Sequence, residues 1–143
     1  MAKCTVKMPD DFIEKVSKLG SQTDEILGRV LAVGGEVVED KVRSNLSAVI
    51  GKNTKEDSRS TGQLLSSLGT SPARVNRDGD MDVKIGFGDN RTDGRSNAMI
   101  AGVLEYGKHG QPPKPFMKPA KAASKSAAID AMVEKLNQEV ASL

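Results

Sequence analysis

The residues with the most reactive side chains are few and far apart. The 143-residue chain has one histidine, His109, and one cysteine, Cys4. Nucleophilic catalysis needs a nucleophile beside a base, and no serine or cysteine lies near His109 in the sequence. One Cys and one His cannot form a structural zinc site without carboxylates. We therefore expect no enzyme activity, no metal and no cofactor. A hydrolase built around His109 is the least favoured alternative.

Three loop motifs resemble ligand-binding loops without matching them. The segments "DNRTDG" and "NRDGD" have the composition of calcium loops, but neither follows the spacing of acidic and glycine residues that such loops require. The segment "GFGDN" lacks both the G-x-G-x-x-G pattern and the G-K-[ST] ending of phosphate-binding loops. Ordinary turns explain all three segments.

A local cluster of positive charge marks the last third of the chain. Between Tyr106 and Ile129 there are five lysines and no acidic residue, namely Lys108, Lys114, Lys118, Lys121 and Lys125. Such lysines could contact DNA phosphates, but few aromatic residues are available to stack on bases. The net charge is only +2. A solvated or protein-facing surface is favoured, with non-specific contact to DNA as the alternative.

The composition points to a thin aliphatic core. Hydrophobic residues make up 37% of the chain and aromatic residues only 3%, so a partner subunit is expected to complete the core. The first residues lack the apolar region of a signal peptide, and no long apolar run is present. We expect a single domain, 1–143, that is made in a cytoplasm and stays soluble.

Apolar spacing predicts the helices that begin and end the chain. A short helix is expected up to Gly20, followed by a long amphipathic helix that Ser21 or Thr23 caps and Gly51 ends. The pair Gly34-Gly35 inside this helix predicts a bend or a close contact with another backbone. The last helix carries its apolar residues on one face. These residues are Ile129, Met132, Val133, Leu136, Val140 and Leu143.

Between the long helices the pattern becomes mixed. "TGQLLSSLGT" predicts one or two helical turns, with Leu64, Leu65 and Leu68 facing inward. "NRDGD" predicts a hairpin turn, because Asp-Gly favours such turns and Met81 to Phe87 alternate in polarity. "AMIAGVLEYG" fits a short helix better than a strand.

These elements give an α+β fold with long N-terminal helices, a β-hairpin or small antiparallel sheet, and a long C-terminal helix. Five segments make up this arrangement. They are a helical N-terminal segment 1–51, a mobile loop 52–60, a hairpin and short helices 61–107, a proline-rich strap 108–118, and a C-terminal helix 119–143.

The order of three motifs resembles a known family. Ser60-Thr61-Gly62-Gln63-Leu64 with Ser66 and Ser67 precedes the hairpin, Ala101–Gly107 follows it, and Pro115-Phe116-Met117-Lys118-Pro119-Ala120 precedes the last helix. Together they resemble the tail-completion (head–tail joining) family of long-tailed bacteriophages, from about residue 60 to the end. The chain departs from the family pattern at Met99 or Ile100, where tyrosine is frequent, and at Lys108, where threonine is common.

The resemblance implies a structural role in the neck or upper tail. There the protein would form a ring with copies of itself, commonly sixfold, that completes the tail or joins it to the head. Its partners would be the tail tube protein and the head connector or stopper protein, with no membrane. A minor tail or tube-associated protein and a small nucleic-acid-associated protein are the alternatives.

The resemblance also implies which residues lie at an interface between subunits. The strap prolines restrict the backbone, so the segment can present the last helix at a fixed angle. Glu105 could cap strap amides or pair with a lysine, and Phe116 could fill its own core or plug a neighbouring subunit. The candidate interface residues are Glu105, Tyr106, Pro115, Phe116, Pro119, Arg91, Arg95, Lys108 and Lys114. The loops Lys52–Ser60 and Asp89–Asn97 are expected to order when the next ring docks.

Overall fold

The computed structural model describes residues 10–50, 62–88 and 96–143. The elements in chain order are α1 (Asp10–Val49), α2 (Gln63–Ser66), β1 (Leu68–Thr70), β2 (Arg74–Val75), β3 (Met81–Asp82), β4 (Ile85–Phe87), α3 (Asn97–Tyr106) and α4 (Met117–Ala141). The predicted α+β class is confirmed. The expected loop Lys52–Ser60 lies outside the described residues, as does most of Asp89–Asn97.

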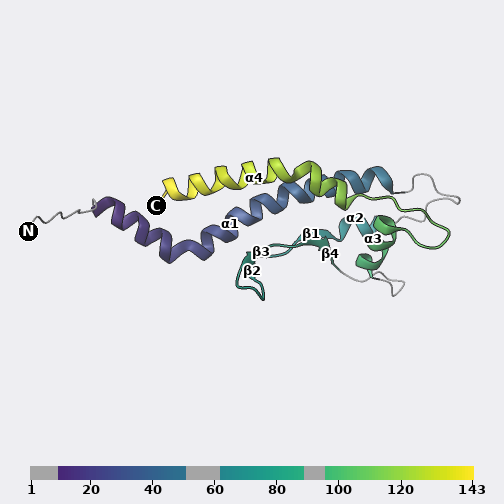
Figure 1. Ribbon diagram of the computed structural model, residues 1–143, viewed down its shortest axis with the longest axis horizontal. Coiled ribbons are helices and arrows are strands. Elements are labelled where there is room, and N and C mark those ends of the chain that lie inside the picture. Colours follow the sequence, from purple (N-terminus) through teal and green to yellow (C-terminus); the bar gives the residue numbers. More distant parts are fainter. Residues whose placement is uncertain (1–9, 51–61, 89–95) are drawn as a thin grey trace, which may run out of the picture.

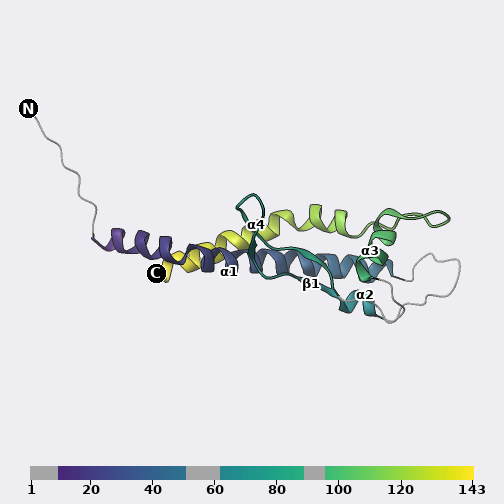
Figure 2. The ribbon, with the colours of Figure 1, turned by 90° about the horizontal axis from the view of Figure 1, so that it is seen from below.

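The two long helices set the shape of the molecule. Figures 1 and 2 show α1 and α4 side by side and antiparallel, with the hairpin strands along α1 and the short helices α2 and α3 gathered at one end. At the other end α1 extends past the C-terminus of α4 in both views. The fold is therefore elongated, and its first helical turns project from the body.

The N-terminal region is one helix rather than the two that the sequence predicted. Gly20 does not end the first helix, because it does not adopt the positive φ of a helix-ending glycine. Ser21 and Thr23 do not cap a second helix either. Their hydroxyl groups donate to the carbonyl oxygens of Lys18 (3.0 Å) and Leu19 (2.6 Å), one turn earlier in the same helix.

The predicted hairpin is confirmed, with an interruption. β2 pairs antiparallel with β3, and β1 pairs antiparallel with β4. At the turn, the Asn76 side-chain oxygen accepts hydrogen bonds from the backbone N–H groups of Asp78 (2.9 Å) and Asp80 (3.0 Å). The strand predicted from Met81 to Phe87 is broken between β3 and β4. There the backbone N–H of Lys84 donates a hydrogen bond to the Ser71 hydroxyl oxygen (2.9 Å).

The core lies at the end where α2, α3 and the start of α4 meet the second half of α1. Its buried members are mostly aliphatic, namely Val42, Leu46, Leu64, Leu68, Ala101, Phe116 and Ala120. Leu64 and Leu68 therefore face inward as predicted, and Leu65 packs partly buried beside them. The Phe116 ring meets the Phe87 ring edge to face, with centroids 6.0 Å apart.

Close packing explains the glycine pair inside α1. A Cβ atom on Gly34 would lie 2.6 Å from Met132 Cγ of α4, and one on Gly35 would lie 2.9 Å from Thr70 Cγ2 of β1. The predicted close contact is thus present, but it is made with side chains rather than with another backbone. Further along, Arg29 forms two hydrogen bonds of 2.7 Å with the Glu139 carboxylate. The hydrogen bonds and charges of Arg29 and Lys135 lower the pKa of Glu139 to about 2.

Most of the apolar face predicted for α4 does not face α1, although Met132 of this face lies against Gly34. Ile129, Val133, Leu136 and Val140 are exposed, whereas the buried residues of α4 are Ala120, Ser124 and Ala128. Small residues let two helices approach closely, whereas Ile129, Val133, Leu136 and Val140 lie on another side. Among the described residues, no helix has the length and apolar character needed to span a membrane.

The two kinds of glycine in α1 predict opposite mutational effects. Gly20→Ala should raise the free energy of unfolding by about 1 kcal/mol, because Ala favours a helix and its Cβ would meet no atom within 4 Å. Gly34→Ala gains the same propensity but must displace Met132, and such overpacking costs about 1–3 kcal/mol. Urea denaturation followed by circular dichroism measures both. An equal gain in the two variants would contradict the packing of α4 on Gly34.

Candidate assembly interface

A buried carboxylate joins the end of α3 to the start of α4. Glu105 is buried, and its two oxygens accept hydrogen bonds from the backbone N–H groups of Phe116 (2.7 Å), Met117 (2.9 Å) and Lys118 (3.0 Å). The first N–H groups of a helix have no partner within it, so Glu105 caps α4 from another helix. This confirms the first of the two predicted roles, the capping of strap amides.

The cap also determines the charge state of Glu105. Burial alone would raise the pKa of this carboxyl group. The three backbone N–H donors of Phe116, Met117 and Lys118, together with the Lys118 charge, outweigh burial and lower the pKa below its ordinary value of 4.5. The carboxylate is therefore ionised at neutral pH, where its negative charge also suits the positive end of α4.

The strap between the two helices reverses direction. The sequence predicted an extended segment, but Lys108 and Gln111 exchange backbone hydrogen bonds of 3.0 and 2.9 Å around a tight turn. Gly107 and Gly110 both have positive φ, and a Cβ on Gly107 would lie 2.8 Å from the Pro113 nitrogen. The returning arm is fixed by Lys114 N, which donates to Leu104 O at 2.7 Å.

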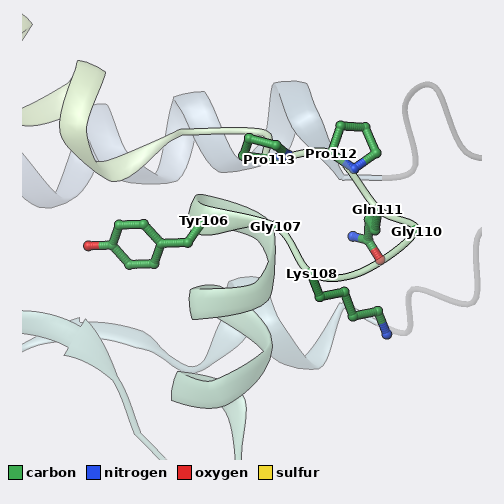
Figure 3. Close-up of a pocket in the computed structure, with 7 residues that line it drawn as sticks. All are labelled: Tyr106, Gly107, Lys108, Gly110, Gln111, Pro112 and Pro113. Atoms are coloured by element: carbon green, nitrogen blue, oxygen red, sulfur yellow. The ribbon is translucent and has the colours of Figure 1, made fainter.

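This end of the molecule presents an open surface. Figure 3 shows Tyr106 and Lys108 extending away from each other, with the returning prolines beside them. An open depression of about 520 Å³ is lined by Tyr106, Gly107, Lys108, Gly110, Gln111, Pro112 and Pro113. Tyr106, which is 82% exposed, carries the largest apolar side chain there. Exposed tyrosines are frequent anchors of protein interfaces, so the surface suits a protein partner.

The structure separates the candidate interface residues into two groups. Glu105 and Phe116 are buried, and Phe116 is 0% exposed. Phe116 therefore fills the core of its own chain, the first of the two alternatives given above. The exposed group consists of Tyr106, Lys108, Pro115 and Pro119, with Lys114 half-buried. Arg91 and Arg95 lie outside the described residues.

His109 is exposed at the tip of the strap turn, and the described residues hold no group of three His, Cys, Asp or Glu that could bind a metal.

The loop predicted up to Asn97 ends before that residue. The Ser96 hydroxyl caps α3 by accepting from Met99 N (3.0 Å), and Asn97 is a buried helix residue that donates to Gly88 O (3.2 Å).

Sequence reasoning did not identify the exposed apolar face of α4 or the projecting start of α1. The spacing of Ile129, Val133 and Leu136 revealed an apolar face, but spacing cannot show which side of a helix its neighbour covers. Ile13 and Val16 of α1 are exposed in the same way. Both surfaces lie away from the strap.

The comparison with protein families identifies the class of the chain. Residues 10–107 match the HK97-gp10-like family, described as "Bacteriophage HK97-gp10, putative tail-component". The match covers more than half of the chain, which therefore belongs to this family of bacteriophage tail components. The strap and α4 lie beyond the matched residues. No curated protein and no solved structure matches the chain.

The cap predicts a pH-dependent loss of stability on mutation. Glu105→Gln should lower the free energy of unfolding at pH 7 by about 1.5–3 kcal/mol, the usual contribution of hydrogen bonds to a charged group. The folded-state pKa is lowered, so this stability is present above pH 4.5 and is lost as pH falls through the folded pKa. The difference from the wild type should therefore shrink in acid.

Urea titrations at pH 7 and at several values below 4.5 measure this difference. Glu36→Gln, a change in an exposed glutamate of α1, is the matched control and should leave stability unchanged within about 0.5 kcal/mol. A Glu105→Gln variant as stable as the control at pH 7 would show that the cap contributes nothing.

Proposed function

We propose that this chain is a structural subunit of the neck or upper tail of a long-tailed bacteriophage. It assembles with copies of itself into a ring, commonly sixfold, that completes the tail or joins it to the head. Its neighbours are the tail tube protein on one side and the head connector or stopper protein on the other. Assembly takes place in the host cytoplasm, and the proposed role includes no catalytic step.

The observation that carries this proposal is the exposed surface around Tyr106 on a rigid support. The tyrosine ends α3, whose preceding residue Glu105 is bonded to three amides of the α4 start. Lys114 N donates to Leu104 O in the same helix (2.7 Å). A surface fixed in this way loses little conformational entropy on binding, which favours a repeated docking contact. Membership in a family of phage tail components supports the same role.

The lysines on the exposed side of α4 support a weaker second contact. Lys118, Lys121 and Lys125 are exposed on its first turns, and they oppose the positive end of the helix rather than complementing it. In a ring through which the genome passes, they could contact DNA non-specifically. This contact would be secondary to the protein interface.

Truncation of Tyr106 tests the docking surface. Tyr106→Ala should reduce the yield of infective particles at least about tenfold, because loss of a central interface aromatic costs about 2 kcal/mol or more. The fold should be retained, since the ring is exposed. Met99→Ala is the matched control, because Met99 lies in the same helix and is also exposed. Plaque counts and thermal melting of the purified variants measure the two effects.

Location in the particle decides between the alternatives. Electron cryomicroscopy of virions should show a closed ring of this chain between head and tail. Density along the tail tube would indicate a minor tail protein instead. Absence from virions, combined with salt-dependent DNA binding by the isolated chain, would overturn the proposal in favour of a nucleic-acid-associated protein.

A further inference from the structure

Two apolar surfaces within residues 10–50 and 96–143 are exposed. One is the α4 stripe, defined here as Ile129, Val133, Leu136 and Val140, of which Val133 is 52% exposed. The other is the α1 arm, residues 10–23, in which Val16 is also 52% exposed and Ile13 is exposed beside it. We propose that the α1 arm of one copy packs antiparallel on the α4 stripe of a neighbouring copy. This inference rests on the proposed role as a repeated subunit.

The α1 arm continues a helix face that already binds an antiparallel helix. Gly34 of α1 lies against Met132 of α4, and Val16 lies about five turns before Gly34 on the same face, at 3.6 residues per turn. Arg29 binds Glu139 close to the end of α4. Beyond that level α1 extends past α4, as both ribbon views show. The arm thus continues the face of α1 that contacts α4, and the α4 helix of the same chain does not cover it.

The spacings of the two surfaces match in the antiparallel direction. Along the arm, Ile13, Val16 and Gly20 are separated by three and then four residues. Along the stripe read backwards, Leu136, Val133 and Ile129 are separated by three and then four residues as well. Antiparallel helices with this spacing bring apolar residues into contact at each level.

In this register Val16 meets Val133, and Gly20 leaves room for the bulky Ile129. The same register brings a charge pair together, because Asp24, the residue after the arm, lies level with Lys125 of the neighbouring α4. Both residues are exposed in the isolated chain. An exposed pair of this kind contributes little to affinity but disfavours a shifted register.

A contact between two copies of the α4 stripe is the competing arrangement. It would leave Ile13 and Val16 uncovered, whereas the arm-to-stripe contact covers Ile13 and Val16 together with Ile129, Val133 and Leu136 of the stripe. The arm-to-stripe contact is also heterologous, since different surfaces of the two copies meet, and repeated heterologous contacts generate rings or open assemblies. The stripe-to-stripe contact would stop at a dimer.

Cysteine cross-linking distinguishes these arrangements. In a Cys4→Ser background, Val16→Cys and Val133→Cys place thiols on the arm and on the stripe. Under mild oxidation at high concentration, each purified single variant should give no cross-linked product, an equal mixture should give a cross-linked dimer, and the double variant should give a ladder of cross-linked oligomers. Val75→Cys replaces the arm variant in a control mixture, because Val75 is exposed and apolar on β2, and this mixture should not cross-link.

Each of the following results would overturn the inference. Cross-linking of Val133→Cys with itself would establish the stripe-to-stripe contact, and absence of any ladder in the double variant would exclude the arm-to-stripe contact. As an independent readout, sedimentation should show self-association at least about tenfold weaker for Val133→Glu than for Val75→Glu, the effect of losing a contact of about 1.4 kcal/mol. Equal association of the two variants would also overturn it.

The cross-linking uses purified protein, whereas the proposed function is judged by the ring in virions. The two can therefore fail separately. A ladder in solution without density at the neck would retain the contact and remove the function. A neck ring whose subunits do not cross-link would retain the function and remove this contact.

Discussion

The interaction on which the strap end of this structure depends is the capping of α4 by a carboxylate from α3. Glu105 receives three amide hydrogen bonds across the strap, so the end of one helix and the start of another become a single rigid unit. Burial opposes the charge, but the three donors outweigh it and keep the pKa low. Because the cap fixes Tyr106 and the returning prolines in place, the most exposed surface at this end is also well supported.

The packing of α1 on α4 places a second constraint on the molecule. Gly34 of α1 leaves room for Met132 of α4, and Ser124 and Ala128 are buried, whereas Ile129, Val133, Leu136 and Val140 remain exposed. A chain with few aromatic residues has a small core at one end and an aliphatic stripe along the other. Such a distribution suits a subunit that is completed by its neighbours, and it agrees with membership in a family of phage tail components.

The sequence and the structure agree best where a local rule decides the conformation. The Asp78-Gly79 turn, the α3 helix ending at Gly107 and the long last helix follow from residue types and spacing. The sequence also indicated that Glu105 could cap the strap. It failed at Gly20, where a residue type that ends many helices lies within α1, and the hydroxyl groups of Ser21 and Thr23 bond to carbonyl oxygens of the same helix instead of capping a new one. The reversal of the strap depends on the backbone hydrogen bonds between Lys108 and Gln111. The spacing of the prolines does not predict these bonds.

The sequence by itself determined the secondary-structure class, the presence of a single histidine and a single cysteine, and the motifs that resemble tail-completion proteins. These properties depend on residue types and on the spacing of near neighbours, and both are present in the sequence itself. Only the tertiary structure decided which face of α4 is covered, that Phe116 fills its own core, and that the start of α1 projects from the body. Those outcomes depend on how closely two distant segments can approach. Here the contact of Gly34 with Met132 and the small buried residues of α4 set that distance, and Ile129, Val133, Leu136 and Val140 lie on the sides that remain exposed.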